Sequence, residues 1–179
     1  MSNIIKFYSH DESKFYHQFS NFYISPFEFF LPNFLQVDNF LKNKFYCESS
    51  EKAIMLSKAI LMNDRDTFNI ILKTKNPAEC KLLGRKVNNF NQNLWDNHIN
   101  EIAYNVLYQK FTSNDELTQL LLNTNNNIIA EATENDNIWG IGLNINDSKL
   151  ENPDEWLGKN ILGYTLMNVR DTIKLNLNY

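Results

Sequence analysis

The sequence predicts one globular domain of 179 residues in which helices outnumber strands. Hydrophobic residues make up 43% of the chain and aromatic residues 13%, which is enough to build a packed core. Several segments repeat apolar residues at the spacing of a helix face, whereas only short runs have the composition of strands. Neither a GxGxxG nor a GxxxxGK[ST] motif is present, so the sequence does not support a Rossmann or P-loop site.

Charge and composition exclude several classes of protein. The net charge is −4 and the pI about 5.4, whereas proteins that clamp a long nucleic acid duplex usually have a basic surface. No apolar run approaches the roughly 18 residues of a membrane helix, and residues 1–6 lack the pattern of a signal peptide. We therefore expect a cytoplasmic protein that does not bind a membrane. Two cysteines imply no disulfide framework, and three scattered histidines predict no metal site. We expect no cofactor.

The first third of the chain contains short, aromatic-rich segments. Residues 4–8 are predicted to form a strand. Ser20 and Asn21 stand between aromatic residues just before a proline turn, which suits either a binding loop or a turn held by its aromatic neighbours. Residues 27–45 are interrupted by Pro and Asn and predict short strands or extended hairpin pieces rather than a helix.

Residues 48–59 have the pattern of a helix that begins at a serine cap. Glu51 lies where a negative charge suits the positive end of the helix. Glu51, Met55 and Lys58 share one face, with about 10 Å along the axis between the outer two. The helix is apolar nearly all round, which predicts burial. Glu51 and Lys58 therefore either converge on one sugar-sized ligand or lie solvated at the edge of the buried surface.

The remaining elements are mainly helical. Pro77 suits the first position of a helix that ends at Gly84, and residues 113–116 have the pattern of a capping box. Arg85, next to Gly84, has the geometry to bind a phosphate, although a Gly-Arg pair is common. The predicted helices are 66–72, 78–83, 93–111, 117–122 and 161–175, and residues 128–133 are a predicted strand.

Residues 134–142 form the second informative loop. It combines acids and amides with Trp139, Gly140 and Gly142, which suits the recognition of hydroxyl groups and stacking on a ring. An exposed turn covered by a tryptophan has the same composition, so the residues leave both interpretations open.

A set of different short motifs occurs along the chain in a particular order. They are Phe19-Ser20-Asn21-Phe22, Ser50-Glu51, Lys58-Ala59, Leu83-Gly84-Arg85, Asn93-Leu94-Trp95, Lys110-Phe111, Ile129-Ala130-Glu131, Asp136, Trp139-Gly140-Ile141-Gly142, Asn160-Ile161-Leu162-Gly163, Leu166-Met167 and Arg170. In this order they resemble the NADAR family, the YbiA-like N-glycosidases, along nearly the whole chain. Lys52 and Ala53 depart from the family, because many members carry a His and an aromatic residue there; this could alter the base pocket.

The resemblance implies a mainly α fold with a small β portion (α+β), in a single YbiA-like domain over residues 1–179. It implies hydrolysis of the bond between ribose C1′ and an exocyclic nitrogen of an N-ribosylamine. Two substrates are associated with the family. One is the phosphorylated ribosylaminopyrimidine intermediate of riboflavin biosynthesis, and the other is ADP-ribose attached to guanine in nucleic acid. The acidic pI mildly favours the small molecule, and the sequence does not predict an oligomeric state.

Breaking a ribosylamine bond needs a proton for the departing nitrogen and stabilisation of positive charge at C1′. Glu51 and Asp136 are the candidate carboxylates. A lysine of lowered pKa could also exchange into the ring-opened imine as a Schiff base, with Lys58 the first candidate and Lys110 the second. The predicted substrate-binding residues are Ser20, Asn21, Phe22, Arg85, Trp95, Lys110, Trp139, Gly140 and Gly142.

A binding module is the competing hypothesis. Such a protein would hold ADP-ribose or another NAD-derived nucleotide through Asn21, Arg85 and Trp139 without hydrolysing it. Incubation separates the two hypotheses, because a binding module returns its ligand intact.

Overall fold

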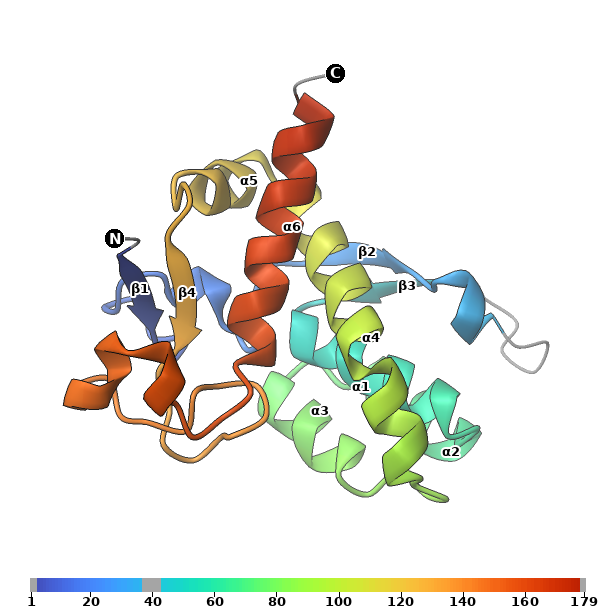
Figure 1. Cartoon of the computed structure of the whole chain (residues 1–179). Coiled ribbons are helices and arrows are strands. Elements are labelled where there is room, and N and C mark those ends of the chain that lie inside the picture. Colours follow the sequence, from blue (N-terminus) through green and yellow to red (C-terminus); the bar gives the residue numbers. More distant parts are fainter. Residues whose placement is uncertain (1–2, 37–42, 178–179) are drawn as a thin grey trace. The chain divides into compact units, whose positions relative to one another are not determined.

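The computed structural model describes residues 3–36 and 43–177. The chain divides into two compact units. Asn21–Ser113 forms one, called here the central unit, and Met1–Ser20 joins Asn114–Tyr179 in the other, called the terminal unit. Figure 1 shows the elements of both. That residues 1–179 act as one domain stays a prediction.

The central unit begins with a β-hairpin. β2 (Phe27–Phe30) and β3 (Lys44–Cys47) pair antiparallel, with Phe27 opposite Cys47 and Phe30 opposite Lys44. Successive side chains alternate between a buried and an exposed face, and the buried ones are Phe27, Phe29, Phe45 and Cys47. The predicted short strands within residues 27–45 are thus confirmed, and residues 37–42 of that stretch lie outside the described residues.

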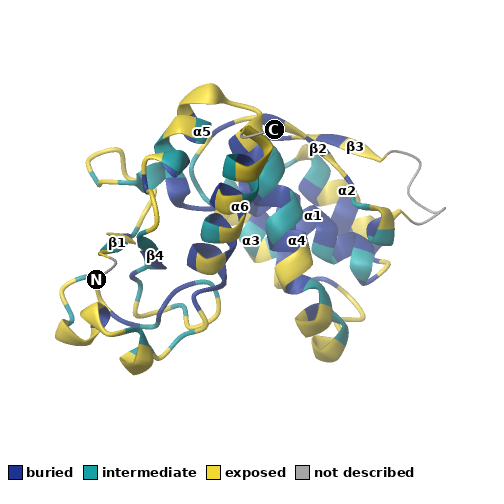
Figure 2. Cartoon of the chain, turned by 45° about the horizontal axis from the view of Figure 1, so that its top comes forward, coloured by how far each residue is buried: buried dark blue, intermediate teal, exposed yellow. Residues whose placement is uncertain are grey.

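α1 (Ser50–Leu61) is the central helix of this unit, and nearly its whole length is buried (Figure 2). It packs against the three helices that follow it, and α4 runs beside it (Figure 1). A helix that is apolar all round needs neighbours on every side, which explains this position. The three neighbours are α2 (Arg65–Lys73), α3 (Pro77–Gly84) and α4 (Gln92–Thr112).

The terminal unit combines the two ends of the chain. β1 (Ile4–Phe7) pairs in parallel with β4 (Ile128–Glu131), and α6 (Ile161–Leu177) packs against β4 (Figure 1). α5 (Asp115–Leu122) packs on α6. Short 3₁₀ turns complete the described elements at His17–Phe19 and Asn33–Leu35, and at Ser148–Glu151 and Pro153–Glu155.

The predicted capping box at residues 113–116 is wrong in its cap. Asn114, not Ser113, caps α5, because its side-chain oxygen accepts the N–H groups of Glu116 and Leu117. Ser113 instead ends α4, where its hydroxyl donates to the carbonyl of Lys110. Both residues are good caps, and the length of α4 decides which one is used.

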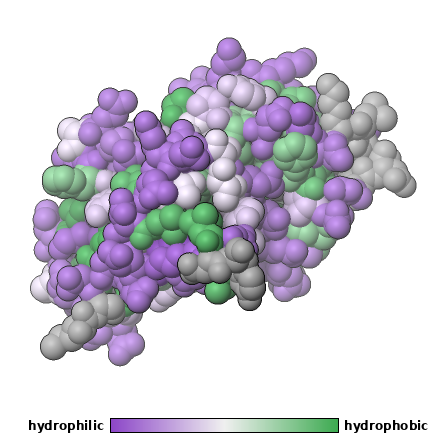
Figure 3. All heavy atoms as spheres, turned by 90° about the horizontal axis from the view of Figure 1, so that it is seen from above, coloured by the Kyte–Doolittle hydropathy of each residue, from purple (hydrophilic) through white to green (hydrophobic). Residues whose placement is uncertain are grey.

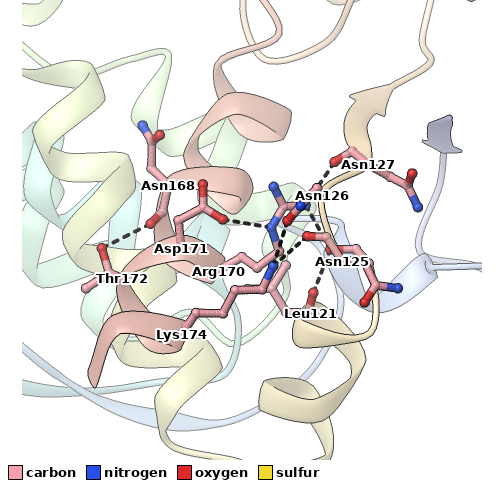
Figure 4. A network of polar contacts seen from close by, with 10 residues as sticks. Leu121, Asn125, Asn126, Asn127, Asn168, Arg170, Asp171, Thr172 and Lys174 are labelled. Carbon is pink, nitrogen blue, oxygen red and sulfur yellow. Dashed lines mark hydrogen bonds and ion pairs between the residues drawn. The ribbon is translucent and has the colours of Figure 1, made fainter. Parts of the chain in front are cut away.

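Arg170 of α6 fixes the turn between α5 and β4 (Figure 4). The guanidinium is buried and donates to Thr124 Oγ1 at 3.0 Å and to the carbonyl of Asn127 at 2.8 Å. It also pairs with Asp171 at 3.1 Å. One turn further on, Lys174 Nζ donates to the carbonyl of Asn125 at 2.7 Å.

Replacing Arg170 with Ala is expected to destabilise the protein by about 2–4 kcal/mol, because the buried acceptors that now bond to the guanidinium would be left without a hydrogen-bond donor. Lys174→Ala is the matched control: it removes a more exposed donor to the same turn and should cost about 1 kcal/mol or less. Urea unfolding followed by circular dichroism measures both. Equal midpoints for Arg170→Ala and wild type would contradict the assignment.

The predicted fold class, mainly α with a small β portion, is confirmed. On the face seen in Figure 3 hydrophilic side chains predominate and apolar ones form small patches. Within the described ranges, no helix combines the length and the apolar character that crossing a bilayer requires.

Candidate active site

Glu51 lies in the first turn of α1, where the helix begins as predicted. Ser49 is the cap, and its hydroxyl accepts the N–H of Lys52 at 3.3 Å. The N–H of Glu51 donates to the carbonyl of Asn21 at 2.9 Å, so the Asn21 loop is bonded to the start of the helix. Glu51 is only 4% exposed, which excludes the solvated interpretation for this residue. The positive end of α1 favours a negative charge at this position.

Two polar atoms beside Glu51 are buried without a partner. Asn21 Oδ1 and Ser50 Oγ make no hydrogen bond with any residue in the described ranges. Leaving a buried polar group unpaired costs about 1–3 kcal/mol, and such groups in a native structure call for an explanation. A ligand hydroxyl is one partner that both atoms could accept. Ser50 was not among the predicted substrate-binding residues, because a serine at the start of a helix is explained most simply as a cap.

The middle of the Glu51 face is occupied by α3. Met55 is buried, and a Cβ on Gly84 would lie 1.9 Å from Met55 Sδ. Gly84 therefore allows α3 to approach α1, which explains this residue by packing as well as by its place near the end of the helix. Arg85 follows directly and is exposed.

Lys58 ends the same face, and its ammonium lies against aromatic rings. Nζ is 4.3 Å from the ring centroid of Phe90 and 5.4 Å from that of Trp95. It makes no hydrogen bond or ion pair with the residues that the structure describes. Burial lowers the pKa of Lys58; the charge of Glu51 opposes this and that of Arg85 adds to it. The amine is therefore available to a ligand and loses its proton more easily than an ordinary lysine.

The loop after Ser20 belongs to the same neighbourhood of the central unit. Lys81 Nζ of α3 lies 5.4 Å from the ring centroid of Phe22, one turn before Arg85. Asn21, the preceding residue, is bonded to Glu51. The central unit thus gathers predicted residues from three elements: the loop that precedes β2, the face of α1, and the segment between α3 and α4.

Lys110 is fully buried in α4. Its Nζ lies 5.5 Å from the ring centroid of Tyr23 and 5.3 Å from that of Phe111, and burial lowers the pKa of Lys110 to about 7. Such an amine is partly neutral at physiological pH and would be reactive if a substrate reached it. Its exposure of 0% distinguishes it from the half-buried Lys58.

The lowered pKa of Lys110 predicts a pH dependence of stability. The folded pKa of about 7 lies below the unfolded value of 10.5, so the unfolded state binds more protons between them and the unfolding free energy rises with pH. We expect a slope of up to about 1.4 kcal/mol per pH unit between about pH 7 and 8.5. Urea unfolding measures it, and Lys110→Met should remove it.

The exposed Lys86→Met is the matched control and should leave that slope unchanged. The window ends below pH 9 because burial raises the pKa of Cys47 to about 12 and that of Cys80 to about 11. Those thiols contribute a loss of stability as the pH rises past their unfolded value of 9.0. Equal slopes in Lys110→Met and wild type would show that Lys110 does not titrate as inferred.

Lys52 is engaged within its own helix region. Its Nζ pairs with Glu48 Oε2 at 2.7 Å, with both side chains largely buried. The neighbouring Ala53 is fully buried. The two positions that are predicted to depart from the family therefore hold a satisfied ion pair and a small core residue beside Glu51.

The other predicted residues lie in the terminal unit. Asp136 Oδ1 accepts the N–H groups of Ile138 and Trp139 at 3.0 and 2.9 Å, so this carboxylate organises its own turn. Trp139, in the same loop, is half-buried. Ser20 follows the 3₁₀ turn at His17–Phe19, and its N–H donates to the carbonyl of His17.

Local backbone geometry accounts for both glycines. A Cβ on Gly140 would lie 2.8 Å from the carbonyl of Glu131, and Gly142 has φ +69°. The share of this loop and of Ser20 in the Glu51 site stays a prediction. Among the described residues, no group of three or more His, Cys, Asp or Glu is placed to hold a metal ion.

A buried carboxylate, Glu51, and an amine with aromatic rings beside it, Lys58, thus lie on one helix and form the candidate site. A family profile described as the NADAR domain matches residues 6–174. The chain belongs to the NADAR family. The predicted family is thereby confirmed.

Individual relatives agree with this assignment. N-glycosidase R617 of Acanthamoeba polyphaga mimivirus is 39% identical over 123 residues, which span 69% of this chain and 72% of that protein. Protein irg-1 of Caenorhabditis elegans is 38% identical over 165 residues, 87% of this chain and 74% of that protein. The NMR structure of Escherichia coli YbiA matches with a TM-score of 0.74 and 27% identity, covering 99% of this chain and 89% of that one. The YbiA-like fold and the enzyme class, a hydrolase of N-glycosyl bonds, are confirmed.

Proposed function

We propose that this chain hydrolyses the bond between ribose C1′ and the exocyclic nitrogen of an N-ribosylamine. The observation that carries the proposal is that a buried carboxylate, Glu51, and a half-buried amine, Lys58, lie on one face of α1. Lys58 has no ion-pair partner among the described residues. The names of the curated relatives support N-glycosyl chemistry in general. The site residues support the choice of a ribosylamine.

The carboxylate and the amine have complementary tasks. Positive charge develops at C1′ as the bond to nitrogen breaks, and the Glu51 carboxylate stabilises it. Once the sugar ring has opened to the imine, the neutral amine of Lys58 attacks C1′. A bond from Nζ to C1′ forms, the bond to the base nitrogen breaks, and both protons of the Lys58 amine pass to that nitrogen. The base leaves as a free amine, and the lysine stays bonded to C1′ as an imine. Water then attacks C1′ and expels the lysine, which yields the free sugar.

Lys58 suits this step better than Lys110. Both amines have a pKa below the ordinary lysine value because of burial. Lys58 is half-buried beside Arg85 and two rings, whereas Lys110 is completely buried. Access therefore favours Lys58 as the nucleophile, and Lys110 is assigned a supporting role in the site.

Other side chains bind the remaining parts of the ligand. Asn21 Oδ1, which lacks a partner in the described ranges, accepts a ribose hydroxyl, and Phe22 lies beside it. The exposed Arg85 binds a phosphate with its bidentate fork. Trp95 shapes the inner wall near Lys58. Asp136, Ser20, Trp139, Gly140 and Gly142 belong to the terminal unit, and a role for them in catalysis or ligand binding stays a prediction from the family resemblance.

The substrate is either a phosphorylated ribosylaminopyrimidine of riboflavin biosynthesis or ADP-ribose on guanine in nucleic acid. The net charge of −4 favours the small molecule. A paired turnover assay decides, with the phosphorylated ribosylaminouracil in one tube and guanine-ADP-ribosylated DNA in the other. Release of ribose phosphate or of ADP-ribose names the substrate. Ligand returned intact from both tubes, together with a raised melting temperature, would replace the enzyme by a binding module.

A further inference from the structure

Phe90 is an exposed aromatic residue on a well-anchored segment. It lies between α3 and α4 and is 42% exposed. The segment is anchored on both sides of the ring, because the N–H of Asn88 donates to Asp64 Oδ2 at 2.7 Å and the N–H of Asn91 donates to Met62 Sδ at 3.3 Å. Asp64 in turn caps α2 through Thr67. The ring is thus held at the surface in a fixed position. Its exposed apolar area gains favourable free energy only when a ligand or another group covers it.

The ring of Phe90 borders the proposed site directly. Lys58 Nζ lies over its face at 4.3 Å from the centroid, the shortest distance from this ammonium to either of its two rings. Trp95, the second ring near this ammonium, is buried and is called here the inner ring. Phe90 is the outer ring, and its exposed area beside Lys58 is left for a ligand.

A flat ring is the ligand group that fits such a surface. Phe offers no hydrogen-bonding group, and aromatic side chains stack on any nucleobase because every base has a π-face. We propose that Phe90 stacks on the nucleobase of the ligand and so selects ligands in which a base accompanies the ribose. The choice of ligand class rests on the proposed function; the contact itself rests on the position of the ring.

The consequence is a preference for a base over no base, without discrimination between a pyrimidine and a purine. Stacking contributes similarly for all bases, whereas telling one from another requires hydrogen bonds to their edges. Both substrate classes considered above carry a base on the departing nitrogen, so one ring would serve either. Phe90 therefore acts on binding rather than on the bond-breaking step.

Two stable probes isolate the base contact. Pseudouridine 5′-phosphate carries a uracil on a C1′–C bond that an N-glycosidase cannot hydrolyse, and ribose 5-phosphate lacks the base. Calorimetry gives the Kd of each for wild type and Phe90→Ala. We expect wild type to bind the base-bearing probe more tightly, and Phe90→Ala to lose about tenfold or more of that preference with ribose 5-phosphate binding unchanged. Phe90→Trp should retain the preference.

Phe30→Ala is the matched control, since Phe30 is a half-exposed phenylalanine of the same unit that also lies beside a lysine, Lys44. It should leave both constants unchanged. Phe90→Leu keeps most of the apolar volume without the flat face, so it reports on stacking if Phe90→Ala lowers the melting temperature. An equal loss for both probes would overturn the proposal, because it would mean that Phe90 acts through Lys58.

The absence of any base preference in wild type, or its persistence in Phe90→Ala and Phe90→Leu, would also overturn it. Failure of the proposed function leaves a different signature. In that case neither ribosylamine substrate is hydrolysed, whereas the binding preference and its dependence on Phe90 remain. Turnover and binding thus report separately on the two claims.

Discussion

Glu51→Gln is expected to lower turnover by about 10²–10⁴-fold while leaving the protein folded. The substitution keeps the shape of the side chain and removes the charge that we propose stabilises C1′. Glu51 is 4% exposed, and its backbone N–H bond to Asn21 does not depend on the side chain, so the start of α1 stays in place. The measurement is kcat on whichever ribosylamine wild type hydrolyses, together with a thermal melt.

Glu79→Gln is the matched control. Glu79 occupies the first turn of α3 as Glu51 occupies that of α1, but it is exposed. Its substitution should leave kcat within about twofold, because a solvated charge at a helix terminus contributes only about 0.3–1 kcal/mol to stability. Full turnover in a folded Glu51→Gln would refute the catalytic assignment, whatever the result for Lys58.

Lys58→Met is expected to reduce kcat about 10²–10³-fold, since it removes the amine and keeps most of the apolar stem. Lys58→Arg should not restore activity, because a guanidinium stays protonated and cannot form an imine. An electrostatic role alone would allow Arg to rescue. These two variants, compared at a pH below and above neutrality, therefore separate nucleophilic from electrostatic assistance.

A covalent intermediate provides the second readout. Borohydride added during turnover should reduce the imine and attach the sugar to wild type, which mass spectrometry detects as an added mass on the peptide with Lys58. The label should be absent from Lys58→Met. A label on the peptide that contains Lys110 instead would move the nucleophile to α4 and would mean that the fully buried amine becomes accessible during catalysis.

Much of the fold could be predicted because its signals are local. The serine cap and the positions of Glu51 and Lys58 on α1 follow from the sequence, as does the proline at the start of α3. The cap of α5 was assigned to the wrong residue because two adjacent residues could cap and only the end of α4 decides. Local pattern is sufficient where one residue type fits, and insufficient where two compete.

The site was predictable only in part, because burial and partners are tertiary properties. The sequence cannot show that Lys110 is completely buried while Lys58 is only half-buried. Nor can it show that Asp136 Oδ1 accepts hydrogen bonds from the backbone of its own turn. Phe90 was missed because a single aromatic residue in a run of asparagines carries no periodic signal. Its proximity to Lys58 depends on how the α3–α4 segment is anchored.

The terminal unit is discontinuous in the sequence, because its two parts, Met1–Ser20 and Asn114–Tyr179, are separated along the chain by the residues of the central unit. β1 hydrogen-bonds to β4 with Ile4 opposite Ile128, so this parallel pair closes a loop that contains every element of the central unit. Closing so long a loop costs entropy before it gains contacts, and parallel pairing is slow for that reason. During synthesis, the first strand to leave the ribosome must wait for the last third of the chain. The central unit, by contrast, has all its residues available long before then.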